Sequence, residues 1–385
     1  MYLLKSLHLQ NLLSFGPDAQ PISLGQLNVL IGPNGSGKSN LLEAVGLLAS
    51  TPRSIGDAIR EGGGVTEWLW KGNKLPIPAS LKAVMDIGGV HLSHEVIFAE
   101  LLQNLMLLDE RIERLEDEAR SPSVLYFGRI NGVPHIRSQT GTMHPAVLNF
   151  NPNESVLSQR RDPVSYPELS WIDLTYSNIA IYRDWQFGRS APPRLPQPAD
   201  LPNIHLLADA RNLGLVLNQI RKNPEAKEAL LKHLSLVFEG VRDVDVSIGG
   251  GTVQVFLHEH KWIIPATRLS DGTLRWLALL AILLNPHARS IVCLEEPEMG
   301  LHPDLLPPLA QLLREASQKM QIIVTTHSDV LVDALTDTPE SVIVCDRSEG
   351  STTMRRLTKE DLATWLEKYS LGQLWRSGEI GGNRW

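Results

Sequence analysis

A glycine-rich run, Gly32-Pro33-Asn34-Gly35-Ser36-Gly37-Lys38-Ser39, has the residue types and spacing of a phosphate-binding loop. It fits the pattern G-x-x-x-x-G-K-S, in which glycines let the backbone fold around an anion and point N–H groups at it. Lys38 would face the β- and γ-phosphates, and the Ser39 hydroxyl would ligate Mg²⁺. The run therefore predicts a site for a nucleoside triphosphate.

The segments on either side of this run have the order that such a loop needs. Residues 27–31 read as a strand that leads directly into the glycines, and apolar residues recur at helical spacing over 41–48. A helix that begins near Gly37 would add its N-terminal N–H groups to the phosphate site. This context disfavours the alternative, a glycine turn with a structural role only.

A second candidate site follows the apolar strand predicted at 291–294, which ends in Glu295-Glu296-Pro297-Glu298. Ligands bind at the carboxyl ends of strands in sheets that helices cover on both faces. One carboxylate there would hold Mg²⁺, and the next would polarise an attacking water. Alone, an acidic pair after a strand is often ordinary surface, but the phosphate loop in the same chain favours the catalytic interpretation.

Two further motifs, together with the phosphate loop and the carboxylate run, give the sequence a resemblance to a known group. They are Ser270-Asp271-Gly272-Thr273 and the run VTTHSD over 324–329, and the carboxylates belong to CLEEPEMGLHP over 293–303. In motif order and spacing the sequence resembles the ABC-type ATPases of the SMC, RecF and OLD group, most closely the compact AAA_21-like branch. The resemblance implies an ATPase that converts ATP and water to ADP and phosphate, with ATP as substrate and Mg²⁺ as cofactor.

The resemblance also implies roles for individual residues. Glu295 corresponds to the metal-site carboxylate, Glu296 to the catalytic glutamate, and His327 to the switch histidine that reaches the γ-phosphate. Gln159 resembles the glutamine that joins Mg²⁺ to the helical lobe, with a solvated loop residue as the alternative. Ser270 would face the ATP of a partner subunit, with a plain helix N-cap as the alternative. The ATP-binding residues expected are Asn34, Gly35, Ser36, Gly37, Lys38, Ser39, Asn40, Ser270 and Gly272, and the expected Mg²⁺ ligands are Ser39, Gln159 and Glu295.

Two departures from the wider group bear on function. Glu295 stands where ABC proteins usually carry Asp, and the added methylene changes how the metal shell is reached. Ser270-Asp271-Gly272-Thr273 replaces the serine-glycine-glycine-glutamine of transporters. The second departure argues against a transporter subunit.

The remaining pattern predicts an α/β fold: an ABC-type head with a mixed sheet, an antiparallel β insertion, a helical lobe and no long coiled coil. Short alternating runs over about 79–137 indicate the insertion, although the charged stretch 109–120 is also compatible with a helical or coiled segment. Helices are expected over 169–185 and 211–239, on either side of a proline-rich linker, and a hairpin over 241–258.

Three parts of the ATPase are expected along the chain. Residues 1–165 would form the N-terminal part of the ATPase lobe with the β insertion. Residues 166–285 would form a helical lobe and hairpin that carry the signature motif, Ser270-Asp271-Gly272-Thr273. Residues 286–385 would form the C-terminal part of the ATPase lobe.

Composition excludes several classes of protein. The 385 residues are 43% hydrophobic and 21% charged, which is typical of a globular chain rather than a disordered or collagenous one. Thirty-six Lys and Arg against 43 Asp and Glu give a net charge of -7, so the whole surface is not built to wrap nucleic acid. The two cysteines suit a reducing compartment, and no apolar stretch approaches the ~20 residues that span a bilayer. We expect a cytoplasmic protein with no membrane partner.

The resemblance further implies a switch that dimerises head to head, with ATP between the phosphate loop of one chain and Ser270 of the other. Relatives of the group serve DNA repair and anti-phage defence, and compact ones often occur with a separate Toprim-like nuclease. A nuclease or nucleic acid is thus the expected partner, and the basic residues of 53–74 make DNA a candidate. The alternative is a slowly hydrolysing nucleotide sensor or scaffold without direct action on nucleic acid, but a pure sensor would not need Glu296.

Overall fold

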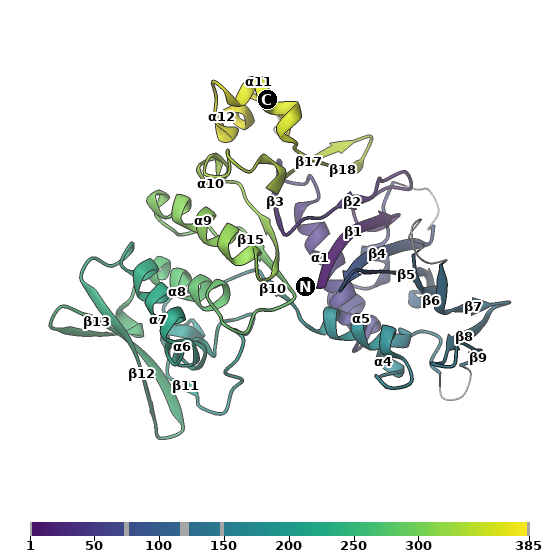
Figure 1. Cartoon of the computed structure of the whole chain (residues 1–385), viewed down its shortest axis with the longest axis horizontal. Helices are drawn as coiled ribbons and strands as arrows, with labels where there is room; N and C mark the ends of the chain where they lie inside the picture. The colour runs from purple at the N-terminus through teal and green to yellow at the C-terminus, as the bar shows by residue number, and fades with distance from the viewer. Residues whose placement is uncertain (1, 73–76, 116–122, 147–149, 383–385) are drawn as a thin grey trace. The chain divides into compact units, whose positions relative to one another are not determined.

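The computed structural model describes residues 2–72, 77–115, 123–146 and 150–382, and the chain divides into two compact units (Figure 1). The first unit comprises Met1–Ile179, Thr338–Trp365 and Leu374–Trp385, and the second comprises Ala180–Asp337 and Leu366–Gln373. These boundaries do not coincide with the three parts expected from sequence. The assignment of 1–165, 166–285 and 286–385 to lobes therefore stays a prediction.

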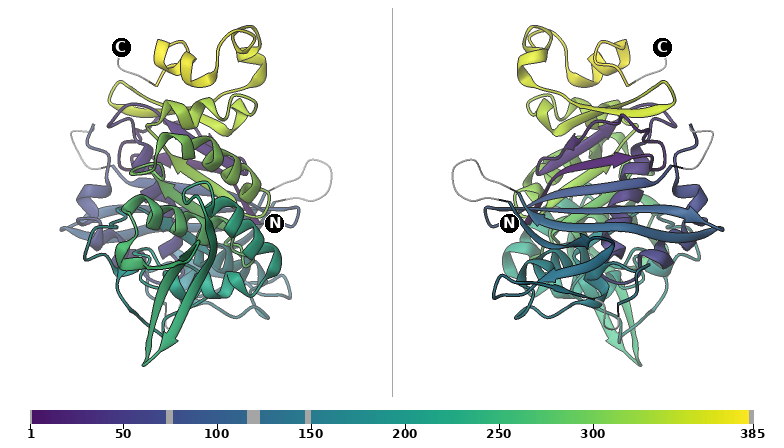
Figure 2. Two further views of the ribbon diagram at one scale, coloured as in Figure 1. Left: turned by 90° about the vertical axis from the view of Figure 1, so that its left-hand side faces the viewer. Right: turned by 90° about the vertical axis from the view of Figure 1, so that its right-hand side faces the viewer.

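The first unit contains an eight-stranded antiparallel sheet in the order β2-β1-β4-β5-β6-β7-β8-β9 (Figure 2, right). Its strands are β1 (Tyr2–Gln10), β2 (Ile22–Ser23), β4 (Ala79–Ile87), β5 (Val90–Leu101), β6 (Asn104–Arg114), β7 (Val124–Ile130), β8 (Val133–Arg137) and β9 (Met143–Pro145). Buried and half-buried residues alternate along β4, so one face of the sheet packs on a core. The antiparallel insertion predicted from sequence is confirmed.

The charged stretch 109–120 is a strand as far as Arg114, so the helical or coiled alternative is wrong for its first part. The reason lies in the side-chain period, because Glu110 and Ile112 are buried and Arg111 between them is exposed. A two-residue period belongs to a strand. Residues 116–122, which include the rest of that stretch, lie outside the described residues.

A mixed group of strands in the first unit carries the phosphate loop. Strand β3 (Leu27–Ile31) is buried along its whole length and pairs in parallel with β17 (Val342–Ser348), which pairs antiparallel with β18 (Ser351–Arg356). The helices before residue 180 are α1 (Lys38–Ser50), α2 (Ile55–Glu61), α3 (Val65–Trp68), α4 (Val156–Gln159) and α5 (Pro167–Ser177). Two more, α11 (Lys359–Leu366) and α12 (Leu371–Ser377), lie near the C-terminus.

The helix expected over 169–185 is shorter than predicted. Helix α5 ends at Ser177, and β10 (Ile179–Tyr182) follows at once. The run Ile-Ala-Ile-Tyr is rich in β-branched and aromatic side chains, which favour a strand where a sheet edge is near.

In the second unit, β10, β15 (Ile291–Glu295) and β16 (Gln321–Thr325) follow one another in a sheet, with β15 and β16 parallel. Its helices are α6 (Leu213–Arg221), α7 (Pro224–Leu234), α8 (Asp271–Leu283), α9 (Leu306–Ser317) and α10 (Asp329–Asp333). A separate antiparallel sheet contains β11 (Gln197–Pro198), β12 (Val241–Gly249), β13 (Thr252–Glu259) and β14 (Trp262–Pro265). Figure 2, left, shows β12 and β13 as a long hairpin, which confirms the hairpin predicted there.

Helix lengths bear on two predictions. The longest helices in the described part of the chain, α1 and α8, have 13 residues each, so these residues form no long coiled coil. Within the same residues, the structure has no helix with the length and apolar character needed to cross a bilayer.

Candidate functional site

The phosphate loop forms the turn between β3 and the first residue of α1. Gly35 and Gly37 have φ angles of 79° and 98°, in the left-handed region that residues other than glycine rarely adopt. A Cβ on Gly37 would lie 2.2 Å from Thr352 Oγ1, so the loop also needs glycine there for space. The predicted residues Asn34 to Asn40 thus occupy one continuous turn at a helix N-terminus, an arrangement that binds anions.

The Lys38 side chain folds back inside this loop. Its residue is 6% exposed, and Nζ donates to the carbonyl oxygens of Gly32 at 2.7 Å and Pro33 at 3.1 Å. Burying an ammonium is costly unless it finds hydrogen-bond partners, and here the loop carbonyls supply them. The arrangement holds a positive charge within the turn.

A contact that sequence reasoning missed supports the loop from the C-terminal hairpin of β17 and β18. Thr352 Oγ1 lies 2.7 Å from Ser14 Oγ and 3.0 Å from the Ser36 carbonyl oxygen, and the Thr352 N–H donates to the Ser14 carbonyl at 2.8 Å. Thr352 is only 2% exposed. No local pattern marks this threonine, because its importance depends on the strand that brings it to the loop.

A cavity of about 690 Å³ opens beside the phosphate loop within the first unit. Gly35 and Asn40 line it from the loop side, and Ser14, Trp70 and Arg347 line it elsewhere. Its volume lies within the range of small-molecule sites.

The carboxylate site lies in the second unit, where β15 and β16 end at the same level. Glu295 pairs in register with Thr325, and the next residue, Glu296, donates its N–H to the Thr325 carbonyl at 3.0 Å. Glu296 Oε1 lies 3.5 Å from His327 Nε2. The structure therefore brings together the two residues expected to be catalytic, a carboxylate and an imidazole.

Glu298 has a role that the sequence alone did not reveal. Its Oε1 accepts hydrogen bonds from the Thr326 hydroxyl at 2.6 Å and the His327 N–H at 2.9 Å, and so fixes the turn that carries the imidazole. Its Oε2 is buried without a hydrogen-bond partner among the described residues. Burial raises the pKa of this carboxyl above its ordinary value, partly offset by the hydrogen bonds.

A second cavity, of about 420 Å³, adjoins the carboxylates within the second unit. Glu295, Glu296, Trp185 and Arg275 are among its lining residues. The Arg275 guanidinium lies 5.7 Å from the centre of the Trp185 ring, and burial lowers its pKa. Its position adds a cation to a pocket that otherwise carries acidic groups.

The signature segment begins helix α8. Ser270 is its N-cap, since Oγ accepts a hydrogen bond from the Thr273 N–H at 3.1 Å. A Cβ on Gly272 would lie 2.7 Å from the Gly300 carbonyl oxygen, so these two backbones approach closely. The capping interpretation of Ser270 is thus observed, and its contact with ATP stays a prediction, as does that of Gly272.

Gln159 bonds its own segment. Its Oε1 accepts from the Asn151 N–H at 2.7 Å, and Nε2 lies 3.0 Å from the carbonyl oxygens of both Asn151 and Glu154. The Gln159 side chain therefore bonds the backbone of the segment that precedes α4. Its expected role as a Mg²⁺ ligand stays a prediction.

The donor atoms of the two sites suit a hard cation. Among the residues described, no group of three or more His, Cys, Asp and Glu side chains is arranged to hold a metal ion. Mg²⁺ does not need such a group, because it usually takes one or two carboxylates and completes its shell with water and substrate phosphates. The Ser39 hydroxyl and the Glu295 carboxylate are oxygen donors of this kind.

The comparison with protein families decides the affiliation. The family AAA_21, described as "AAA domain, putative AbiEii toxin, Type IV TA system", matches residues 27–333, which include the phosphate loop, the signature segment and the carboxylates. The chain belongs to the AAA_21 family. Its sequence is also 21% identical over 320 residues to an "ATP/GTP phosphatase" of Helicobacter pylori (strain ATCC 700392 / 26695), covering 80% of this chain and 81% of that protein.

Solved structures of SMC heads share the fold. One is an SMC head bound to the C-winged helix domain of ScpA, with a TM-score of 0.56, 14% identity and coverage of 93% of this chain and 99% of that one. Another is an SMC head with an extended coiled coil from Pyrococcus furiosus, bound to the C-terminal domain of ScpA, with a TM-score of 0.57, 12% identity and coverage of 96% and 99%. The resemblance and the ABC-type head fold predicted from sequence are confirmed.

Proposed function

We propose that this AAA_21 protein binds and hydrolyses ATP and works as an ABC-type switch. The observation that carries the proposal is the contact between Glu296 and His327 at the ends of β15 and β16, in a chain that also has a complete phosphate loop. A carboxylate beside an imidazole is suited to activating water. A protein that only sensed nucleotide would not need this pair.

In the proposed reaction the phosphate loop binds ATP, and the carboxylate site activates the attacking water. Backbone N–H groups of the loop and the Lys38 ammonium stabilise the β- and γ-phosphates, and Mg²⁺ held by Ser39 and Glu295 would neutralise phosphate charge. Glu296 takes a proton from the attacking water while the oxygen of that water forms a bond to the γ-phosphorus. The bond between that phosphorus and the oxygen shared with the β-phosphate breaks, which leaves ADP and phosphate.

Assembly is the second part of the proposal. In a lone head the γ-phosphate would face water, whereas the N-terminus of α8 offers N–H groups and a favourable dipole behind Ser270. We propose that ATP joins two copies head to head with Ser270 and Gly272 of one copy against the nucleotide of the other. Water excluded from that interface would strengthen each charge interaction.

Such a switch would act on a partner protein. SMC heads with the same fold bind domains of ScpA, which supports a protein partner as the receiver of the nucleotide state. We propose a nuclease of the Toprim-like kind, in DNA repair or anti-phage defence.

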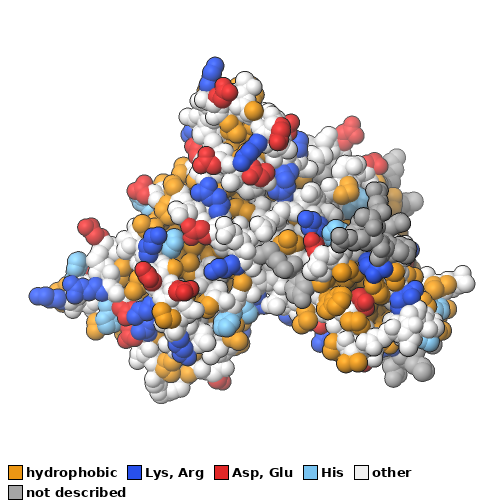
Figure 3. All heavy atoms as spheres, in the orientation of Figure 1, with side chains coloured by type: hydrophobic (Ala, Val, Ile, Leu, Met, Phe, Trp, Pro, Cys, Tyr) orange, Lys and Arg blue, Asp and Glu red, His pale blue; other side chains and the backbone are white. Residues whose placement is uncertain are grey.

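Direct DNA contact by the basic residues of 53–74 has little support from their surroundings. Arg60 pairs with Asp57, Lys71 pairs with Glu67, and Lys74 lies outside the described residues. The face of the molecule drawn in Figure 3 carries both basic and acidic side chains. Non-specific nucleic-acid binding depends on Lys and Arg side chains that neutralise phosphates, and pairing with neighbouring carboxylates offsets that positive charge.

The deciding experiment measures phosphate release by the purified full chain with Mg-ATP. We expect turnover by the wild type and a loss of ~10²–10⁴-fold in Glu296→Gln, which keeps ATP bound but cannot take the proton. Glu315→Gln, the same change at an exposed position on α9, serves as the control. A wild type that binds ATP and dimerises without turnover would instead be the nucleotide sensor.

A further inference from the structure

The segment that follows helix α12, residues 378–382, lies against the phosphate loop within the first unit. A Cβ placed on Gly382 would lie 3.5 Å from the Cα of Gly32, the first residue of the loop. The Gly32 carbonyl oxygen accepts a hydrogen bond from Lys38 Nζ at 2.7 Å. The segment therefore approaches the loop at a residue that holds the lysine expected to face the phosphates.

Side chains from α12, β17 and β18 fix this segment. The Gly382 N–H lies 3.2 Å from each carboxylate oxygen of Asp346, and the Gly382 carbonyl accepts from Trp375 Nε1 at 3.0 Å. The Ile380 carbonyl accepts from the Arg355 guanidinium at 3.1 Å. Trp375 is 8% exposed and Ile380 is 2% exposed, so the segment also buries apolar surface. Its place beside the loop is therefore defined by specific contacts.

Strand β17 confines the same loop residue. A Cβ on Gly32 would lie 2.2 Å from the Cys345 carbonyl oxygen. Val344 on this strand pairs in register with Ile31, the residue before the loop, and a Cβ on Gly382 would lie 3.0 Å from Val344 Cγ1. The start of the phosphate loop is thus packed against β17 and against a segment that β17 itself helps to hold.

We propose that residues 378–382, held by Trp375 and Asp346, are a positioning element for ATP binding that keeps Gly32 in the conformation that receives the phosphates. The inference rests on the proposed function and deepens it, since none of these residues belongs to the phosphate loop, the signature segment or the carboxylate run. A loop that is ordered before ATP arrives does not pay the entropy of ordering when it binds. The element therefore raises the affinity for ATP.

The positioning role predicts a particular separation of effects. Activation of water is assigned to Glu296 and His327, which lie after β15 and β16 in the second unit. Loosening Gly32 should weaken the binding of ATP in the ground state and the transition state alike. The affinity should therefore fall while kcat at saturating ATP stays nearly constant.

The experiment uses the full chain with Gly382→Ala. Gly382 has a φ of 73°, and the new Cβ would lie 3.0 Å from Val344 Cγ1 and 3.3 Å from Trp375 Nε1, so the segment must shift away. We expect the Kd for Mg-ATP, measured by calorimetry, to rise about tenfold, the cost of ordering one backbone residue on binding. Backbone hydrogen exchange over residues 29–38 should speed up about tenfold, and kcat should stay within about twofold.

Gly132→Ala is the matched control. Gly132 has a φ of 78° in the turn between β7 and β8 of the same unit, and a Cβ there meets no atom within 4 Å among the described residues. The variant therefore has the same backbone strain without the displacement. It should leave the Kd and the exchange over residues 29–38 unchanged.

A gentler pair of variants guards against a misfolded Gly382→Ala. Asp346→Ala removes both the negative charge and the acceptor of the Gly382 N–H, whereas Asp346→Asn removes the charge and keeps an oxygen that accepts. We expect Asp346→Ala to weaken ATP binding and Asp346→Asn to restore it. Because both variants lose the same charge, a difference between them reports the hydrogen bond rather than the electrostatic potential at the loop.

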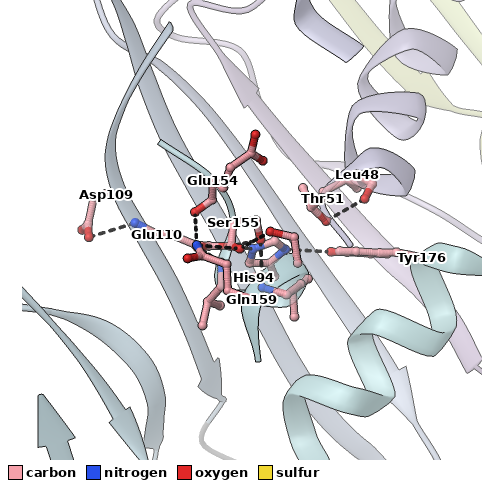
Figure 4. A network of polar contacts seen from close by, with 12 residues as sticks. Leu48, Thr51, His94, Asp109, Glu110, Glu154, Ser155, Gln159 and Tyr176 are labelled. Atoms are coloured by element: carbon pink, nitrogen blue, oxygen red, sulfur yellow. Dashed lines mark hydrogen bonds and ion pairs between the residues drawn. The ribbon is translucent and has the colours of Figure 1, made fainter. Parts of the chain in front are cut away.

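Residues 154–157 provide an internal reference for exchange in the same unit. Their backbone is held by Glu110 on β6, whose carboxylate accepts from the Ser155 hydroxyl and the Val156 N–H (Figure 4). Neither partner belongs to residues 378–382. Exchange over residues 154–157 should therefore be the same in the wild type and in each variant.

Specific results would overturn the proposal. Equal Kd and equal exchange in Gly382→Ala and Gly132→Ala would show that residues 378–382 do not hold the loop. Faster exchange over residues 154–157 as well as 29–38, or a fall in kcat as large as the loss of affinity, would mean that the segment serves general stability only. A wild type that does not bind ATP would refute the proposed function itself, and the exchange comparison without nucleotide would still decide whether the segment holds Gly32.

Discussion

Glu296 Oε1 lies 3.5 Å from Nε2 of His327, and the two residues meet because β15 and β16 run parallel and end side by side. Glu296 has a φ of 44°, in the left-handed region that is uncommon for residues other than glycine. Strain of this kind persists where the surroundings hold it, and its N–H bond to Thr325 is one such restraint. The geometry directs a carboxylate toward an imidazole at the edge where ligands bind.

Replacing His327 with alanine should therefore slow hydrolysis without preventing ATP binding. We expect kcat to fall on the order of 10²-fold, because the Glu296 carboxylate loses the imidazole that helps to position it. Phosphate release at saturating ATP measures the effect. The exposed His287 gives the control His287→Ala, and equal rates in both variants would remove His327 from the catalytic site.

Lys38→Ala should weaken ATP binding by about 10²-fold or more, the cost of losing charge-assisted hydrogen bonds to phosphate. Calorimetric titration with Mg-ATP measures the change. Lys5→Ala removes an exposed ammonium from β1 and should leave the affinity unaltered. Unchanged affinity in Lys38→Ala would contradict the phosphate-loop assignment.

ATP should drive dimerisation, and Ser270→Arg should prevent it by crowding the approach of a second copy. Sedimentation of the Glu296→Gln protein with and without Mg-ATP measures the mass, alone and with Ser270→Arg added. Ser270→Ala separates the two roles of this residue, since it removes the cap and costs about 1 kcal/mol of stability but leaves the approach open. An ATP-dependent dimer that survives Ser270→Arg would refute the head-to-head model.

The buried carboxyl of Glu298 should make stability depend on pH. Burial raises its pKa above the ordinary 4.5, so the folded protein holds this proton more tightly than the unfolded chain does. Its contribution to the free energy of unfolding is fully present below pH 4.5 and is lost as pH rises through the raised pKa. Glu298→Gln removes this dependence, so its stability relative to the wild type should improve as pH rises.

Denaturant unfolding of both proteins, at pH 4.5 and in steps above it, tests this sign. Gln318→Ala, at an exposed position without an ionisable group, should keep a constant difference from the wild type over the same range. A constant difference for Glu298→Gln would mean that its pKa is not raised by folding.

Gly272→Ala should destabilise the second unit, because the new Cβ would lie 2.7 Å from the Gly300 carbonyl oxygen. Backbone must shift to relieve that contact, and overpacking of this kind costs about 1–3 kcal/mol. Gly249→Ala is the control, since a Cβ there meets no atom within 4 Å among the described residues. Equal unfolding free energies for the two variants would show that the close approach is not needed.

The order of amino acids determined the local units of this protein. The phosphate loop, the carboxylate run after β15 and the β12–β13 hairpin were predictable because each is continuous in the chain. Their conformations follow from glycine's freedom at positive φ and from the period of apolar residues. Even here a boundary was missed, since the apolar run of β10 suits either a helix end or a strand.

Only the tertiary structure decided which distant residues meet. Hydrogen bonds join Thr352 to the phosphate loop, Glu298 to the His327 backbone, and Glu110 to the start of α4. Each contact depends on strand order and register, which the tertiary structure as a whole specifies rather than any local preference. In the sequence Glu110 is one acidic residue among many. In the fold it is buried, and a buried polar group needs hydrogen-bond partners, so its contacts are specific.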